Sequence, residues 1–161
     1  MTIFGKSLSE YISFQKVVLI LFAVVGLLRL GLSLGGVPNS SAKWLSLTIL
    51  VPITIFYYPI RSQITGFGTY KNLLPLYFIQ TLIMQAIISV GIVIAIVADK
   101  DNIYSAPEFY HGTGTGRSWG HVFAHIVVVT VFMTTVAWLI SSLVLFVASK
   151  TFRPRTQPVE T

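Results

Sequence analysis

The sequence predicts an all-α integral membrane protein, a bundle of four transmembrane helices with both ends of the chain on the cytoplasmic side. Two observations lead to this fold class. Hydrophobic residues make up 54% of the 161 residues and charged residues only 10%, whereas a soluble domain carries about a quarter charged residues. In addition, four apolar stretches approach or exceed the roughly 17 to 25 residues that cross a bilayer as a helix. We expect a single domain over residues 1–161, covered largely by lipid.

The four stretches set the expected order of the elements. The predicted spans cover residues 17–34, 44–60, 73–97 and 122–147, and a short basic tail follows at 148–161. The first span could be mistaken for a cleaved signal peptide, because Ser40, Ser41 and Ala42 faintly resemble a cleavage site. Its apolar run is long and further spans follow it, so we interpret it as an uncleaved anchor.

Basic residues between the spans predict the orientation, since lysine and arginine accumulate in cytoplasmic segments. With a cytoplasmic N-terminus, seven of them lie inside and three outside. The inner set is Lys6, Lys16, Arg61, Lys71, Lys150, Arg153 and Arg155, and the outer set is Lys43, Lys100 and Arg117. We therefore expect a multi-pass protein of the cell (inner) membrane, in which the net charge of +6 serves orientation and no nucleic acid is bound.

The candidate site lies on the predicted outer side, where the long loop at 98–120 joins the third and fourth spans. His121 and His125 are one helical turn apart, so both rings project from the same side of the helix. Such a pair can chelate a divalent zinc or copper ion, and His111 or Glu108 of the loop could complete its coordination. The alternative is an interfacial or structural role, because the pair lacks the glutamate of the HExxH zinc motif. Haem is less expected, since the other spans contain no histidine.

Other polar residues are costly within a membrane. Arg29, in the first span, is expected to reach the outer headgroups or to pair with an acid such as Asp99, Asp101 or Glu108. Buried polar candidates in the later spans are expected to form hydrogen bonds between helices, and include Gln85, Thr134 and Thr135. On a regular helix Thr130, Thr134 and Ser141 would face away from the histidines. Gly31 and Gly35 form a GxxxG motif that would let another helix approach closely.

These features leave three classes of function open. We expect first a non-catalytic accessory, assembly or scaffold component of a membrane complex, working as a homo-oligomer or with other membrane subunits, because no nucleophile–base pair is evident. The alternative is a metal- or ligand-binding protein, redox-associated or not, with its histidine site on the outer face. A small transporter is the third class, and it is less supported because the spans lack charged coupling residues and inverted repeats.

Overall fold

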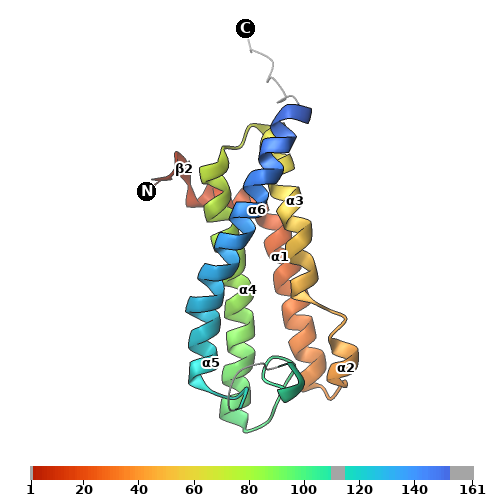
Figure 1. Cartoon of the computed structure of the whole chain (residues 1–161). Helices are drawn as coiled ribbons and strands as arrows, with labels where there is room; N and C mark the ends of the chain where they lie inside the picture. Colours follow the sequence, from red (N-terminus) through yellow and green to blue (C-terminus); the bar gives the residue numbers. More distant parts are fainter. Residues whose placement is uncertain (1, 110–114, 153–161) are drawn as a thin grey trace.

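The computed structural model describes residues 2–109 and 115–152 (Figure 1). Its described part contains four helices that are long and apolar enough to cross a membrane, which confirms the predicted helical class. Each helix is longer than its predicted span, because hydropathy marks the apolar stretch while polar and aromatic residues continue the helix beyond it. The helical stretches are Leu8–Leu34, Asn39–Thr65, Tyr70–Ala98 and Trp119–Thr151.

Short elements accompany the long helices. In chain order the elements are β1 (Thr2–Ile3), β2 (Lys6–Ser7), α1 (Leu8–Leu34), α2 (Asn39–Ala42), α3 (Leu47–Thr65), α4 (Tyr70–Ala98), η1 (Pro107–Phe109), α5 (Trp119–Phe123), η2 (Ala124–Val129) and α6 (Thr130–Thr151). The antiparallel β1–β2 hairpin, the single turn α2 and the π-helical turn η2 are not evident from hydropathy. Hydropathy averages over a long window, and these elements are shorter than that window.

Local sequence signals explain where the long helices begin and end. Ser7 caps α1, because its hydroxyl accepts from the Glu10 backbone N–H while the Glu10 carboxylate accepts from the Ser7 backbone N–H. Thr69 and Asn72 form a similar box at the start of α4. At the end of α3, Gly66 has a φ of 66°, a left-handed conformation that glycine adopts without steric cost.

Most of the apolar surface of the long helices faces outward. Only 22% to 39% of each apolar stretch is buried within the molecule, so the remaining apolar side chains need a non-aqueous environment. The buried side chains form two clusters, one at each end of the long helices. The first includes Phe22, Leu30, Leu47, Met84, Ile92 and Tyr104, and the second includes Tyr11, Phe14, Tyr58, Leu76, Tyr77 and Leu145.

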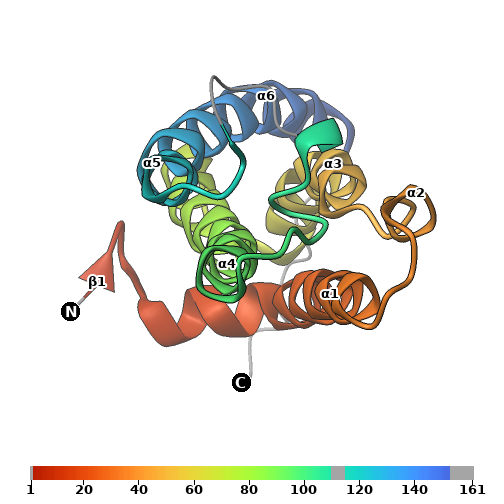
Figure 2. The same ribbon diagram turned by 90° about the horizontal axis from the view of Figure 1, so that it is seen from below.

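The helices pack so that α4 and α6 share a long seam. α4 packs against both α1 and α6, and α6 also packs against α3. Figure 2 shows that α5 lies beside α4, whereas the later part of α6 lies beside α3. The N-terminal hairpin lies next to the start of α1, toward the same end of the molecule as the last turn of α6 (Figure 1).

The connection between α4 and α5 is partly built into the core. Residues 102–106, here called the plug, are all less than 9% exposed. Three hydrogen bonds hold the plug: Asn102 Nδ2 donates to Gly91 O at 2.6 Å, the Ile103 N–H to Ser33 Oγ at 2.9 Å, and Tyr104 Oη to Gly26 O at 2.9 Å. This part of the predicted loop therefore closes one end of the helices instead of lying free in solvent.

Candidate functional site

The two histidines of the fourth helical stretch face each other directly. Ser118 begins α5, and its hydroxyl accepts from the His121 backbone N–H at 3.2 Å. His125 lies one turn later, within η2. The Nε2 atoms of His121 and His125 are 3.0 Å apart, and their ring centroids are 4.7 Å apart. The predicted pairing of these two side chains is thus seen in the structure.

The other ring nitrogen of each histidine faces a carbonyl oxygen. His125 Nδ1 lies 2.6 Å from Gln85 Oε1 on α4, and His121 Nδ1 lies 2.7 Å from Gly116 O. The backbone carbonyl oxygen of Gly116 can only accept a hydrogen bond, so His121 Nδ1 carries the proton and donates it. In a neutral imidazole the second nitrogen then has no proton. The lone pair of His121 Nε2 therefore faces His125 Nε2, which lies within hydrogen-bond distance of it.

A π-helical turn brings His125 to this position. On a regular α-helix, residues five apart are separated by about 140°, which predicts that Thr130 and His125 lie on different sides. In η2 the Thr130 backbone N–H instead donates to His125 O, and the Thr130 hydroxyl donates to the same oxygen at 3.0 Å. The predicted opposition of the two faces is wrong, because the wider turn directs both His125 and Ser141 toward α4.

A buried polar seam continues from this site along α4. Tyr77 Oη donates to Thr54 O at 3.0 Å and also contacts the Ser141 hydroxyl, and Gln80 Nε2 donates to Thr54 Oγ1 at 3.1 Å. Ser141 Oγ in turn donates to Ile55 O at 3.0 Å. Hydrogen bonding between helices, which the sequence predicts for the polar residues of the later spans, is thus present in the seam.

The three polar residues that the sequence analysis singles out in these spans behave differently. Gln85 holds His125, a pairing that the sequence does not reveal. The Thr135 hydroxyl donates to Val131 O in its own helix at 2.9 Å and the side chain is exposed. Thr134 is only 4% exposed, yet its hydroxyl has no hydrogen-bond partner in the described part of the chain. A buried hydroxyl without a partner costs about 1–3 kcal/mol, so Thr134 requires an explanation.

The proposed additional metal ligands are not assembled with the histidine pair. Glu108 Oε1 accepts from Asn39 Nδ2 at 3.2 Å, on α2. His111 lies outside the described residues. Within residues 2–109 and 115–152, no group of three or more histidine, cysteine, aspartate or glutamate side chains is close enough to hold one ion. The described part of the site thus offers two ligands, both imidazole nitrogens.

Arg29 contacts an aromatic ring and not an acid. Asp99 and Asp101, two of its expected partners, instead pair with Arg117 at 2.6 and 3.4 Å. The Arg29 guanidinium lies 5.4 Å from the centre of the Tyr104 ring in the plug, a favourable cation–π geometry. Burial raises the pKa of Tyr104 to about 12, while the Arg29 charge acts in the opposite direction. Tyr104 therefore keeps the hydroxyl proton that it donates to Gly26 O.

The glycines used for close packing differ from the motif. A Cβ at Gly31 would have no atom of another element within 4 Å, and one at Gly35 would meet only carbonyl oxygens of α1. Among the glycines inside helices, the close approaches are instead at Gly26, where a Cβ would lie 3.0 Å from Ile87, and at Gly91, where it would lie 2.5 Å from Tyr104. Contact of Gly31 and Gly35 with a separate helix stays a prediction.

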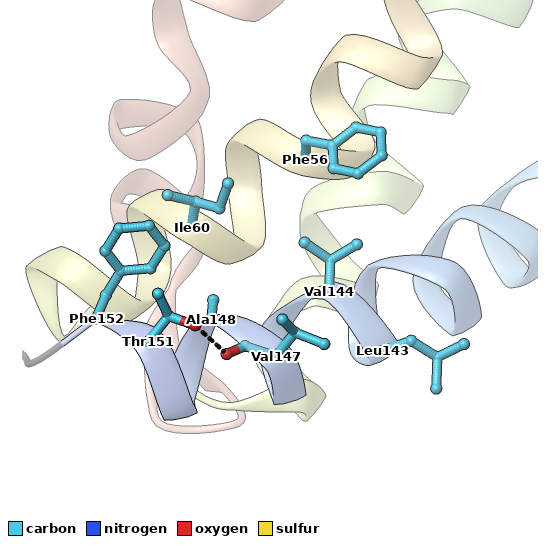
Figure 3. Close-up of a pocket in the computed structure, with 8 residues that line it drawn as sticks. All are labelled: Phe56, Ile60, Leu143, Val144, Val147, Ala148, Thr151 and Phe152. Carbon is cyan, nitrogen blue, oxygen red and sulfur yellow. Dashed lines mark hydrogen bonds between the residues drawn. The ribbon is translucent and has the colours of Figure 1, made fainter.

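An apolar groove lies far along the chain from the histidines, between α3 and α6. It has a cavity volume of about 380 Å³. Figure 3 shows the side chains that line it: Phe56, Ile60, Leu143, Val144, Val147, Ala148, Thr151 and Phe152. The hydroxyl of Thr151 is bonded to Val147 O of its own helix, so the groove offers no polar group in need of a partner.

The fold and the site together describe a chain with four helices apolar enough to cross a membrane and a histidine pair at one end of them. Comparisons with family models, with curated proteins and with solved structures found no match to this chain. Its function must therefore be inferred from its own geometry.

Proposed function

We propose that this chain is a multi-pass membrane protein that binds one divalent transition-metal ion between His121 and His125. The observation that carries the proposal is the 3.0 Å separation of two Nε2 atoms on one side of a helix, with the Nδ1 atom of each ring held by an oxygen of Gln85 or Gly116. A divalent ion at this position would replace the hydrogen bond between the rings and take a lone pair from each Nε2. The proposed membrane topology has both termini in the cytoplasm, with the histidine pair in the outer half.

The surroundings of the rings support a metal ion. Histidine ligands in proteins almost always donate their second N–H to a carboxylate, a carbonyl or water, which fixes the ring and its tautomer. Gln85 and Gly116 supply those acceptors here. With metal–nitrogen bonds of about 2.0–2.1 Å, a nitrogen separation of 3.0 Å gives an angle of about 95° at the metal. This angle favours the tetragonal geometry of Cu(II) over the tetrahedral geometry of zinc.

Metal titration of the purified protein tests the proposal. Cu(II) added to wild-type protein in mild detergent should bind in a one-to-one ratio and give an electron paramagnetic resonance spectrum with hyperfine splitting from imidazole nitrogens. His125→Ala and His121→Ala should each abolish this spectrum. His111→Ala should show whether the loop histidine is a third ligand. Wild-type protein that binds no more Cu(II) than His125→Ala would overturn the proposal.

The protonation of the rings offers a second test. Nitrogen NMR of protein loaded with diamagnetic Zn(II) should show protonated Nδ1 and unprotonated Nε2 in both imidazoles, because both Nε2 atoms would ligate the ion. If His125 were instead protonated at Nε2 alone, the Gln85 amide would have to donate to Nδ1, and the two lone pairs would not converge. That result would contradict the tautomer argument even if some metal were bound.

A second proposal is that the chain acts as a non-catalytic component of a membrane assembly. The observation that favours it is the groove between α3 and α6, whose lining is apolar and open for a side chain of a neighbouring helix (Figure 3). Leu143→Ala and Phe56→Ala should then weaken co-purification of a partner subunit without changing the amount of the chain in the membrane. Equal recovery of all partners with wild-type protein and both variants would refute it.

A further inference from the structure

The N-terminal hairpin is held in a strained conformation beside the start of α4. Phe4 and Gly5 form its turn with φ values of 49° and 81°, and the left-handed conformation of a residue such as Phe4 costs on the order of 1–2 kcal/mol. Two partly buried hydrogen bonds compensate for this strain: Asn72 Nδ2 donates to Phe4 O at 3.1 Å, and Tyr11 Oη donates to Ile3 O at 2.8 Å. Strain that is held in this manner often marks a ligand clamp.

The hairpin covers one end of a groove between α4 and α6. The groove has a volume of about 340 Å³, within the range of small-molecule sites. Its lining is Ile3, Phe4, Leu74, Pro75, Phe78, Val131, Thr134 and Thr135. Of its two hydroxyls, Thr135 is bonded within its own helix. Thr134 also lines the groove, and its buried hydroxyl, which has no partner among the described residues, is the polar group that a rotation of the side chain would offer to a ligand there.

A cation lies on the same face of α4, nearer to the start of the helix. Lys71 precedes Leu74, Pro75 and Phe78 by three, four and seven residues, the spacing of one helical face. Lys71 is exposed, and it forms no ion pair with the described residues. Four residues of helix separate it from Pro75 by about 6 Å along the axis. In the proposed topology Lys71 lies at the inner membrane surface and Thr134 lies deeper.

We propose that this groove binds one glycerophospholipid of the inner leaflet. The phosphate contacts the Lys71 ammonium, an ester carbonyl accepts from the Thr134 hydroxyl, and an acyl chain lies against Leu74, Phe78 and Val131 under the hairpin. An anionic phosphate followed by an ester carbonyl a few ångströms deeper is the arrangement that a phospholipid presents and a neighbouring helix does not. The proposal rests on the proposed membrane insertion and is independent of the histidine site.

Lipid retention in matched variants tests this assignment. Wild-type protein purified in mild detergent from membranes should retain about one phospholipid per chain, counted by native mass spectrometry and lipid phosphorus. Thr134→Val keeps the side-chain shape and removes one hydrogen bond, so affinity measured by lipid titration should fall about fivefold. Lys71→Ala should lower it similarly for an anionic lipid such as phosphatidylglycerol.

Two controls separate the groove from general effects. Thr135→Val removes a hydroxyl that is already bonded within α6, and Lys16→Ala removes an exposed cation on α1, so both should retain lipid like wild type. Retention by Thr134→Val equal to that of Thr135→Val would overturn the proposal, as would wild-type protein with no bound phospholipid. Carbonate extraction measures membrane insertion separately: release of wild-type protein from the membrane would contradict the proposed membrane insertion, whereas retained protein without bound phospholipid would contradict the lipid site alone.

Discussion

Gly91 is the position at which one added methyl group should reveal how the plug stabilises the fold. A Cβ at this position would lie 2.5 Å from Cδ2 and 3.4 Å from Cβ of Tyr104, and 3.3 Å from Leu30 Cδ1. Real Cβ atoms do not approach other heavy atoms within 3.0 Å, so Gly91→Ala must displace the Tyr104 ring. The plug would then be driven outward from the end of the helices.

The magnitude follows from three contributions. Overpacking of a buried site costs about 1–3 kcal/mol, and displacement of Tyr104 weakens its hydrogen bond to Gly26, worth about 0.5–1.5 kcal/mol. Alanine in place of glycine inside a helix returns about 0.5–1 kcal/mol. We therefore expect the free energy of unfolding of Gly91→Ala to fall by about 2 kcal/mol. Gly31→Ala is the matched control, because its Cβ would meet no other element, and it should leave stability unchanged or slightly higher.

Reversible unfolding by sodium dodecyl sulfate in mixed micelles, followed by circular dichroism, measures both variants under the same conditions. In the Tyr104→Ala background, Gly91→Ala should lower the free energy of unfolding much less than it does in wild type, since the clashing ring is gone and the two effects are coupled. Gly91→Ala as stable as Gly31→Ala would refute the reasoning, because it would mean that Tyr104 does not pack against α4 as described.

Two further predictions concern the π-turn and the topology. Deletion of Val127 should convert η2 to a regular helix and rotate His125 by about 100° away from Gln85, so Cu(II) affinity should fall at least tenfold. The control variant Val127→Ala should bind Cu(II) like wild type. Equal Cu(II) binding by the deletion variant would contradict the role of the π-turn. Because the chain contains no cysteine, the single substitutions Lys71→Cys and Lys100→Cys report the topology by labelling in intact cells. A membrane-impermeant maleimide should react with the cysteine at position 100 only. Reaction at position 71 only would show the opposite orientation.

Much of the fold is predictable because hydropathy is a local property. The four apolar stretches identify the four long helices without knowledge of their packing, and the i, i+4 spacing already places His121 and His125 together. The buried plug is harder to predict, since the 98–120 segment is polar and glycine-rich. Its burial depends on the space that Gly91 leaves for Tyr104, which no local pattern reveals.

The sequence by itself determined the number of apolar helices, their approximate limits and the meeting of two histidines on one turn. Only the tertiary structure decided what surrounds those histidines: the π-turn rotates His125 toward Gln85, while Arg117 and not Arg29 pairs with Asp99 and Asp101. The physical reason is that hydropathy sums over neighbours along the chain. The partner of a polar group depends instead on the rotation of each helix about its axis, which packing sets.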